Sequence, residues 1–173
     1  MNPQIEHLTD KNILNLVSKN LNTVLAKDKF TGFDDLAKTI SSLPNYYRSV
    51  AATNELDINL TLNNLSSYFG NTYSWAYSNE TLKGLTYLGA NKEADVFKES
   101  MEAIKPHWLK IGLVLKKEDE LIEYFESSGL EEDLEQLDQK FRECINEKEF
   151  GVMSYWVDYA RNHANEVKIN NRV

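Results

Sequence analysis

The chain has 173 residues, of which 42% are hydrophobic and 11% aromatic, so it is long and apolar enough to bury a core. Its net charge of −8 argues against direct binding of nucleic acid or of an anionic membrane surface. A lone cysteine, Cys144, excludes an internal disulfide, and no stretch has the roughly 20 apolar residues of a membrane-spanning helix.

The first half of the chain carries apolar residues at helical spacing. Thr9 is a suitable N-cap for a helix whose apolar stripe runs from Ile13 to Leu25, and a second pattern stops at Pro44, which suits the first turn of the next helix. We expect a break near Asn54. After it, one stripe ended by Gly70 is formed by Ile58, Leu62, Leu65, Tyr68 and Phe69.

The second half continues in the same way. A helix is expected to end at Gly89, and Asn91 is placed to cap the next one, which reaches Pro106. Later apolar groups at helical spacing are Trp108, Ile111 and Leu115, then Leu121, Ile122 and Phe125, then Leu134, Leu137 and Phe141, and finally Val152, Trp156, Tyr159, Ala160 and His163. Because no useful period-2 alternation appears, the sequence predicts one all-α, compact multi-helix domain over residues 1–173.

The negative charge is concentrated in one segment. Residues 118–149 hold thirteen acids and three bases, a net charge of −10, whereas the rest of the chain is close to neutral at +2. Acids three or four residues apart share a helix face, so the segment predicts outward-facing rows of carboxylates. The candidate partner-binding residues are Glu118, Asp119, Glu120, Glu123, Glu126, Glu131, Glu132, Asp133, Glu135 and Asp138.

Carboxylates at i and i+4 lie roughly 6 Å apart along a helix, and one DNA strand carries a phosphate about every 3.4 Å. One row therefore reaches around half the charge density of a strand, and two adjacent rows, or rows from two subunits, would approach it. Like charges at this spacing each cost a few tenths of a kcal/mol. The acidic segment is thus compatible with either an interaction surface for a basic protein or an ordinary solvated face.

No pattern typical of catalysis, cofactor binding or metal binding is present. His7, His107 and His163 are scattered, and no histidine spacing matches a metal-ligand motif. The glycines are isolated and form no phosphate-binding loop, and no residue beside Cys144 would activate it as a nucleophile. We therefore expect no enzyme activity, no catalytic residue, no metal and no cofactor. Because the start of the chain lacks the features of a signal peptide, we expect a cytoplasmic protein.

The middle of the chain resembles a widespread bacterial family of helical domains that includes small acidic DNA-mimic proteins. The family pattern is a Gly-Gly-Phe-x-Gln-Tyr-Phe-like helix start followed by a helix that ends in Leu…Ile-Gly-Ala. The matching residues here are Tyr68, Phe69, Asn71, Leu82, Leu85, Leu88, Gly89, Ala90 and Ala94. The Gly-Gly-Phe position reads Asn63-Asn64-Leu65 instead, and the likeness covers about residues 56–104.

The resemblance implies an all-helical homodimer without enzyme activity. Its mimic members bind DNA-binding proteins, such as helix-turn-helix repressors and histone-like nucleoid proteins, in place of DNA. Together with the acidic segment, this leads to the hypothesis that the chain is a DNA mimic that regulates transcription and contacts neither nucleic acid nor membrane directly. The alternatives are an immunity protein that neutralises a basic nuclease toxin and a small enzyme of unrecognised type. The aromatic patch of Tyr68, Tyr73, Trp75 and Tyr77 is expected to serve core and dimer contact rather than a ligand groove.

Overall fold

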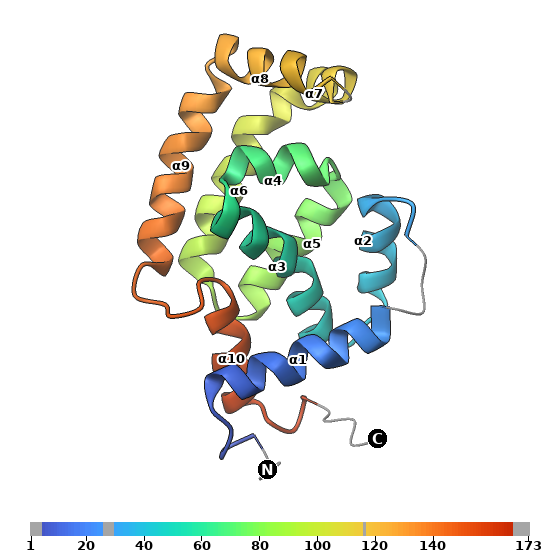
Figure 1. Cartoon of the computed structure of the whole chain (residues 1–173), viewed down its shortest axis with the longest axis vertical. Coiled ribbons are helices and arrows are strands. Elements are labelled where there is room, and N and C mark those ends of the chain that lie inside the picture. The colour runs from blue at the N-terminus through green and yellow to red at the C-terminus, as the bar shows by residue number, and fades with distance from the viewer. Residues whose placement is uncertain (1–4, 26–29, 116, 168–173) are drawn as a thin grey trace.

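All regular structure in the described part of the chain is helical, which confirms the all-α class. The computed structural model describes residues 5–25, 30–115 and 117–167 (Figure 1). A short 3-10 helix, η1 (Lys105–His107), joins α6 to α7. The α-helices are α1 (Asp10–Leu25), α2 (Phe33–Ser41), α3 (Asn45–Leu62), α4 (Leu65–Thr72), α5 (Trp75–Tyr87), α6 (Asn91–Ile104), α7 (Trp108–Val114), α8 (Glu118–Ser127), α9 (Leu130–Ile145) and α10 (Met153–Asn162).

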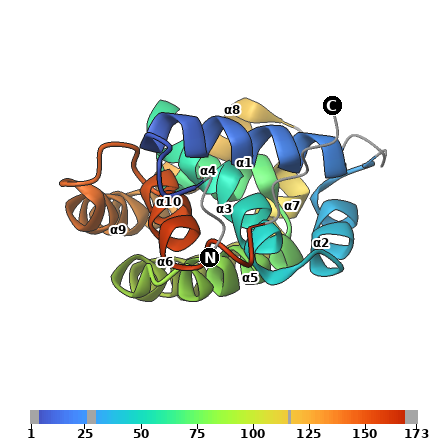
Figure 2. The same ribbon diagram turned by 90° about the horizontal axis from the view of Figure 1, so that it is seen from below.

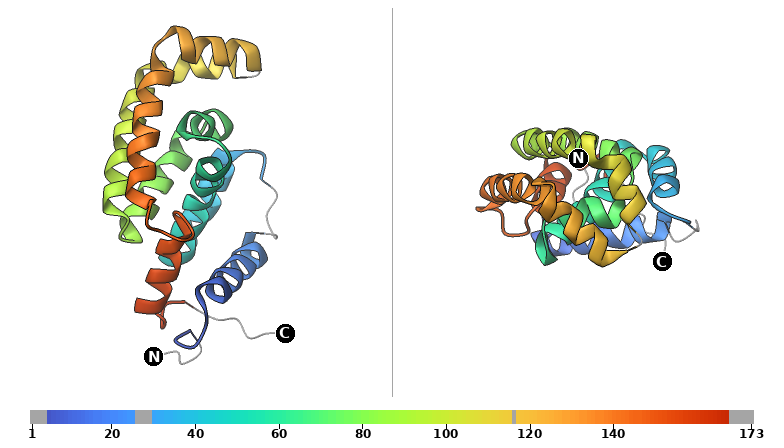
Figure 3. Two further views of the ribbon diagram at one scale, coloured as in Figure 1. Left: turned by 60° about the vertical axis from the view of Figure 1, so that its left-hand side comes forward. Right: turned by 90° about the horizontal axis from the view of Figure 1, so that it is seen from above.

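Helix α3 is the centre of the packing. It contacts α1, α2, α4, α5 and α10, while α6 pairs with α9 along one flank (Figure 1). Helix α1 crosses below α3 and α10, as the view from below shows (Figure 2). Helices α7 and α8 form an arm at the opposite end, next to α4 (Figure 3). None of the helices in the described ranges combines the length with the apolar character that crossing a bilayer requires.

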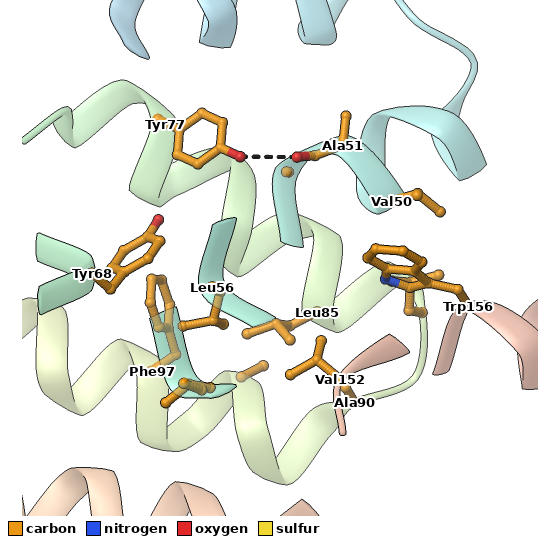
Figure 4. Close-up of a cluster of buried hydrophobic side chains, with 14 of the residues drawn as sticks. Val50, Ala51, Leu56, Tyr68, Tyr77, Leu85, Ala90, Phe97, Val152 and Trp156 are labelled. Carbon is orange, nitrogen blue, oxygen red and sulfur yellow. Dashed lines mark hydrogen bonds between the residues drawn. The ribbon is translucent and has the colours of Figure 1, made fainter. Parts of the chain in front are cut away.

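The core combines aromatic and aliphatic side chains, and several of its polar groups form hydrogen bonds within it (Figure 4). The Tyr77 hydroxyl donates to the carbonyl oxygen of Ala51 at 2.9 Å (Figure 4). The indole Nε1 of Trp156 donates to the hydroxyl of Thr53 at 2.9 Å, and that hydroxyl donates to the carbonyl of Ser49 at 2.8 Å. These bonds join α10 and α5 to α3, and they remove the cost of burying unpaired polar groups.

Helices α3 and α5 approach each other closely at Gly84. A Cβ atom at this position would lie 3.1 Å from the carbonyl oxygen of Ser49 and 3.2 Å from Cγ2 of Thr53. Both neighbours belong to α3, and Ser49 Cα would lie only 3.3 Å away. The absence of a side chain at Gly84 therefore lets the two backbones touch, which places α5 firmly against the central helix.

Several helix ends lie where the sequence predicts them. The Thr9 hydroxyl accepts a hydrogen bond from the amide of Asn12 at 3.3 Å, as an N-cap does. Pro44 immediately precedes α3. Gly89 has a φ of +82°, and the amide of Ala90 donates to the carbonyl of Leu85 at 2.9 Å, so α5 ends in a left-handed glycine turn.

Three predictions about helix ends are wrong. Asn91 is the first residue of α6 and not its cap, which is Ala90. No break occurs at Asn54, because α3 is continuous from Asn45 to Leu62. The break comes at Asn63 and Asn64 instead, where the Asn64 side chain accepts from the amide of Ser67 at 2.9 Å and starts a new helix. Gly70 does not end that helix, which continues to Thr72. An asparagine able to cap thus determines the boundary more strongly than a glycine that can remain helical.

The predicted stripe that runs from Ile58 to Phe69 is also wrong. Ile58 is 41% exposed and Leu62 is 72% exposed, whereas Leu65, Tyr68 and Phe69 are buried. The stripe spans two helices that change direction at Asn63, so its members do not share one face. Ile122 of α8, one of the apolar residues at helical spacing, is likewise 52% exposed.

Candidate partner-binding site

The acidic segment forms a corner made of α8 and α9. The turn between them passes through Gly129, whose φ of +74° is in the left-handed region that favours glycine. Phe125 of α8 and Leu134 and Phe141 of α9 are buried, and they fix the inner faces of the two helices. The opposite faces are therefore held toward solvent on a packed scaffold.

Most of the predicted acidic residues are exposed, but one is not. The side chain of Glu118 lies outside the described residues. Asp138 is only 8% exposed. The exposed members are Asp119, Glu120, Glu123, Glu126, Glu131, Glu132, Asp133 and Glu135.

Asp138 is a structural residue, which corrects its assignment to the partner-binding surface. One carboxylate oxygen accepts from the amide of Leu65 at 3.0 Å, and the other accepts from Nε of Arg142 at 2.6 Å. Arg142 in turn donates to the carbonyl of Asn63 at 2.6 Å. Through these bonds Asp138 and Arg142 hold the first turn of α4 and the residue after α3 against α9. Asp138 is therefore not available to a partner.

The exposed carboxylates are largely unneutralised. Glu120 pairs with Lys117 at 2.6 Å. Across the described part of the chain, no ion pair is formed by Asp119, Glu123, Glu126, Glu131, Glu132, Asp133 or Glu135. The corner therefore presents seven exposed carboxylates that form no ion pair with a described residue.

Some of these acids have a local role as well. Glu131, Glu132 and Asp133 occupy the first turn of α9, and Asp119 and Glu120 lie in the first turn of α8. Negative charge at a helix N-terminus is stabilising, by about 0.3–1 kcal/mol per group. Glu123, Glu126 and Glu135 lie outside first turns and have no such benefit. These three are the acids whose presence the fold explains least.

The two helices do not place their rows side by side. Helix α9 runs down the flank beside α6, whereas α8 runs along the end of the molecule above α4 (Figures 1 and 3). The carboxylates thus bend around a corner instead of forming two parallel rows. Within one chain, the geometry does not reproduce the two-row arrangement that would approach the charge density of one DNA strand.

A groove lies inside this corner. It has a volume of about 740 Å³ and separates α4 from α7, α8 and α9. Its apolar part comes from α8 and the end of α7, its polar part from α4, and its one charged lining residue from α9. The lining residues are Asn64, Ser66, Ser67, Gly70, Asn71, Leu115, Leu121, Ile122, Phe125 and Glu131.

A second, smaller cavity of about 340 Å³ lies over the start of α3. Here Glu80 accepts from Nε of Arg48 at 2.5 Å and from Nζ of Lys83 at 2.9 Å. Burial acts to raise the pKa of Glu80, but the hydrogen bonds and charges of Arg48 and Lys83 outweigh it and lower that pKa. Because both cations are paired with Glu80, this cluster serves to tie α3 to α5.

The three histidines and Cys144 do not gather into one site. Nδ1 of His107 is 2.8 Å from the hydroxyl of Tyr124, which links η1 to α8, and His163 stacks on Tyr159 with ring centroids 4.0 Å apart. His7 is exposed and Cys144 is half-buried. Among the residues that the structure describes, no group of three or more His, Cys, Asp and Glu side chains could hold a metal ion.

The aromatic patch belongs to the core of this chain. Tyr68 and Tyr77 are fully buried, and burial raises the pKa of Tyr68 to about 12. Tyr73 stacks on Trp108 with centroids 4.5 Å apart, and Trp75 meets the same ring edge-on at 5.2 Å. Neither of the two cavities described above is lined by any of these four residues.

The sequence model of the family described as DMP19-like protein matches residues 41–163. The chain belongs to the DMP19-like family. The match begins at the last residue of α2 and continues through α10, so it includes the whole acidic corner and the groove. It is wider than the segment whose residues suggested a resemblance. No curated protein and no solved structure matches the chain.

Proposed function

We propose that this DMP19-like protein binds a basic DNA-binding protein in place of DNA, through the exposed carboxylates of α8 and α9. Occupation of the partner's phosphate-binding surface would exclude DNA, and a promoter repressed by that partner would be released. The partner class is a helix-turn-helix regulator or a histone-like protein. No catalytic step, metal or cofactor is part of the proposal.

The observation that carries the proposal is the set of exposed acids at the corner that form no ion pair with a described residue. Glu123, Glu126 and Glu135 are exposed, have no ion pair with a described residue, and lie outside the first turns where acids stabilise a helix. Like charges held on a rigid scaffold cost stability unless something offsets them. A basic partner offsets them, and complementary charge also raises the rate of encounter.

The binding should be strongly dependent on salt. Dissolved ions screen the interaction between exposed charges, with a screening length of about 8–10 Å near physiological ionic strength. A largely ionic contact therefore weakens as salt is added. A test starts with capture of partners from extract at low salt and elution with a salt gradient. The captured protein is then purified, and its binding to duplex DNA is measured with and without the DMP19-like chain.

The decisive variant reverses the charge of Glu123, Glu126 and Glu135 to lysine. A matched control reverses Glu6, Asp95 and Asp158, three exposed acids outside α8 and α9, and changes the net charge by the same amount. We expect the first triple variant to lose partner binding and the control to retain it, with the helical CD signal unchanged in both. Equal loss in the two variants would mean that only net charge matters, and retention of a nuclease alone would favour an immunity role.

A further inference from the structure

One side of the groove inside the acidic corner, its floor, is lined by apolar residues, and the other side is polar. Leu121 and Phe125 of α8 lie beside Leu115, and the facing wall is α4 with Ser67 and Gly70. The arm of α7 and α8 stands over α4 in the side view (Figure 3). A Cβ at Gly70 would lie 3.6 Å from Cδ2 of Leu121, so a side chain larger than alanine at this position would narrow the floor.

One of the apolar side chains that line the groove is exposed to solvent. Ile122 is 52% exposed and lies next to Leu121 on the same lining surface. A large aliphatic side chain left in water forfeits about 1.5–3 kcal/mol relative to full burial. A ligand with apolar side chains would recover part of this free energy, which a purely ionic contact would not.

The one charged residue that lines the groove is an acid, and other acids lie close to it on the same helices. Glu131 lines it, and Glu126 and Glu135 follow one helical turn from Ile122 and from Glu131. None of the three is paired with a described residue. Two described bases near these acids already have acidic partners, because Lys117 pairs with Glu120 and Arg142 pairs with Asp138. An occupant must therefore combine apolar side chains with positive charge.

We propose that the groove receives a basic amphipathic helix of the partner protein. Apolar residues at i, i+3 or i+4, and i+7 of that helix would enter the floor, and flanking lysines or arginines would reach Glu126, Glu131 and Glu135. Seven residues of helix extend about 10 Å, so such an apolar row covers about two helical turns. The inference rests on the proposed function, since the same acids take part, but it adds an apolar anchor and names the element bound.

The key variant is Ile122→Glu. It removes an apolar side chain from the groove lining and adds a negative charge. If the basic ligand bound through charge alone, its binding would be kept or strengthened. If its apolar side chains dock in the groove, its binding would be weakened. Leu113→Glu is the matched control, because Leu113 is 77% exposed on α7 and does not line the groove. Both changes are at exposed positions, and CD checks that the fold is kept.

The probe is a labelled synthetic helical peptide with a leucine row flanked by lysines, titrated against the full chain by fluorescence anisotropy. We expect it to bind at least tenfold more tightly than a scrambled peptide of the same composition, and a glutamate version of it to show no binding. Ile122→Glu should weaken binding about tenfold, and Leu113→Glu less than twofold.

Three outcomes would overturn the inference. The first is that the scrambled peptide binds as tightly as the designed one. The second is that the Ile122→Glu protein binds the designed peptide as tightly as the unchanged protein does. The third is that Ile122→Glu converts a self-associated chain to monomer, which would identify a second copy as the occupant. Loss of binding in the Glu123, Glu126 and Glu135 variant with full binding in Ile122→Glu would leave the proposed function standing and refute only the groove.

Discussion

A carboxylate oxygen of Asp138 lies 3.0 Å from the backbone amide nitrogen of Leu65 and accepts its hydrogen bond. Leu65 is the first residue of α4, where amides have no partner within their own helix. Asp138, which is buried, therefore supplies from α9 a partner for the first amide of α4, while the N-cap Asn64 accepts from the amide of Ser67. One acid of the acidic segment thus holds the scaffold together instead of facing a partner.

Replacement of Asp138 by alanine should lower the free energy of unfolding by about 1–3 kcal/mol, because it leaves the buried amide of Leu65 without a partner. Urea denaturation followed by CD measures the change. Glu135→Ala is the control, since this acid is exposed on the same helix and its removal should change stability by no more than about 0.5 kcal/mol. Equal stability of the two variants would contradict the structural role of Asp138.

The contrast between Asp138 and Glu135 indicates how much the sequence can predict. Both fall in the same i, i+3 pattern of α9, and only the approach of α4, more than sixty residues earlier in the chain, buries one of them. Helix ends at Thr9 and Gly89 were predictable because their signals are local. The groove was not, since its walls come from α4, α7, α8 and α9, and no local pattern records how these meet.

The acids in the first turn of α9 should contribute to stability apart from any partner. Glu132→Gln should lower the free energy of unfolding by about 0.3–1 kcal/mol, because the glutamate interacts favourably with the helix N-terminus. Glu135→Gln should cause no loss, and a gain of a few tenths of a kcal/mol is expected from relief of repulsion with Glu131. High salt should shrink the difference between the variants. A difference that persists unchanged in high salt would exclude this electrostatic origin.

Two glycines in helices should respond in opposite directions to alanine. Gly84→Ala should destabilise the protein, because the new Cβ would lie 3.1 Å from the Ser49 carbonyl oxygen. Gly70→Ala should stabilise it by up to about 1 kcal/mol, since alanine favours helix and the nearest atom to the new Cβ is 3.6 Å away. Thermal unfolding compares the pair, and a Gly84→Ala protein more stable than the parent would show that α3 and α5 can separate at little cost.

The Glu80 cluster should make stability depend on pH in a defined direction. The folded-state pKa of Glu80 lies below its ordinary value of 4.5, so at moderately acidic pH the unfolded chain takes up a proton that the folded chain does not. The stabilisation is present in full above about pH 4.5 and is lost as the pH falls through the folded-state pKa. Glu80→Gln should therefore cost most near neutral pH, roughly 1–3 kcal/mol for the loss of charge-assisted hydrogen bonds to Arg48 and Lys83.

This pH dependence is best measured as a difference between proteins, because the other carboxylates titrate in both and their contributions cancel. Urea unfolding of the parent and of Glu80→Gln across the acidic range should give a gap that closes as the pH falls below 4.5. Glu135→Gln, which removes an exposed acid without a described ion pair, should not reproduce that closing gap. A gap of constant size at every pH would mean that Glu80 contributes through its packing and not through its charge, since only the charged form gains from the two cations.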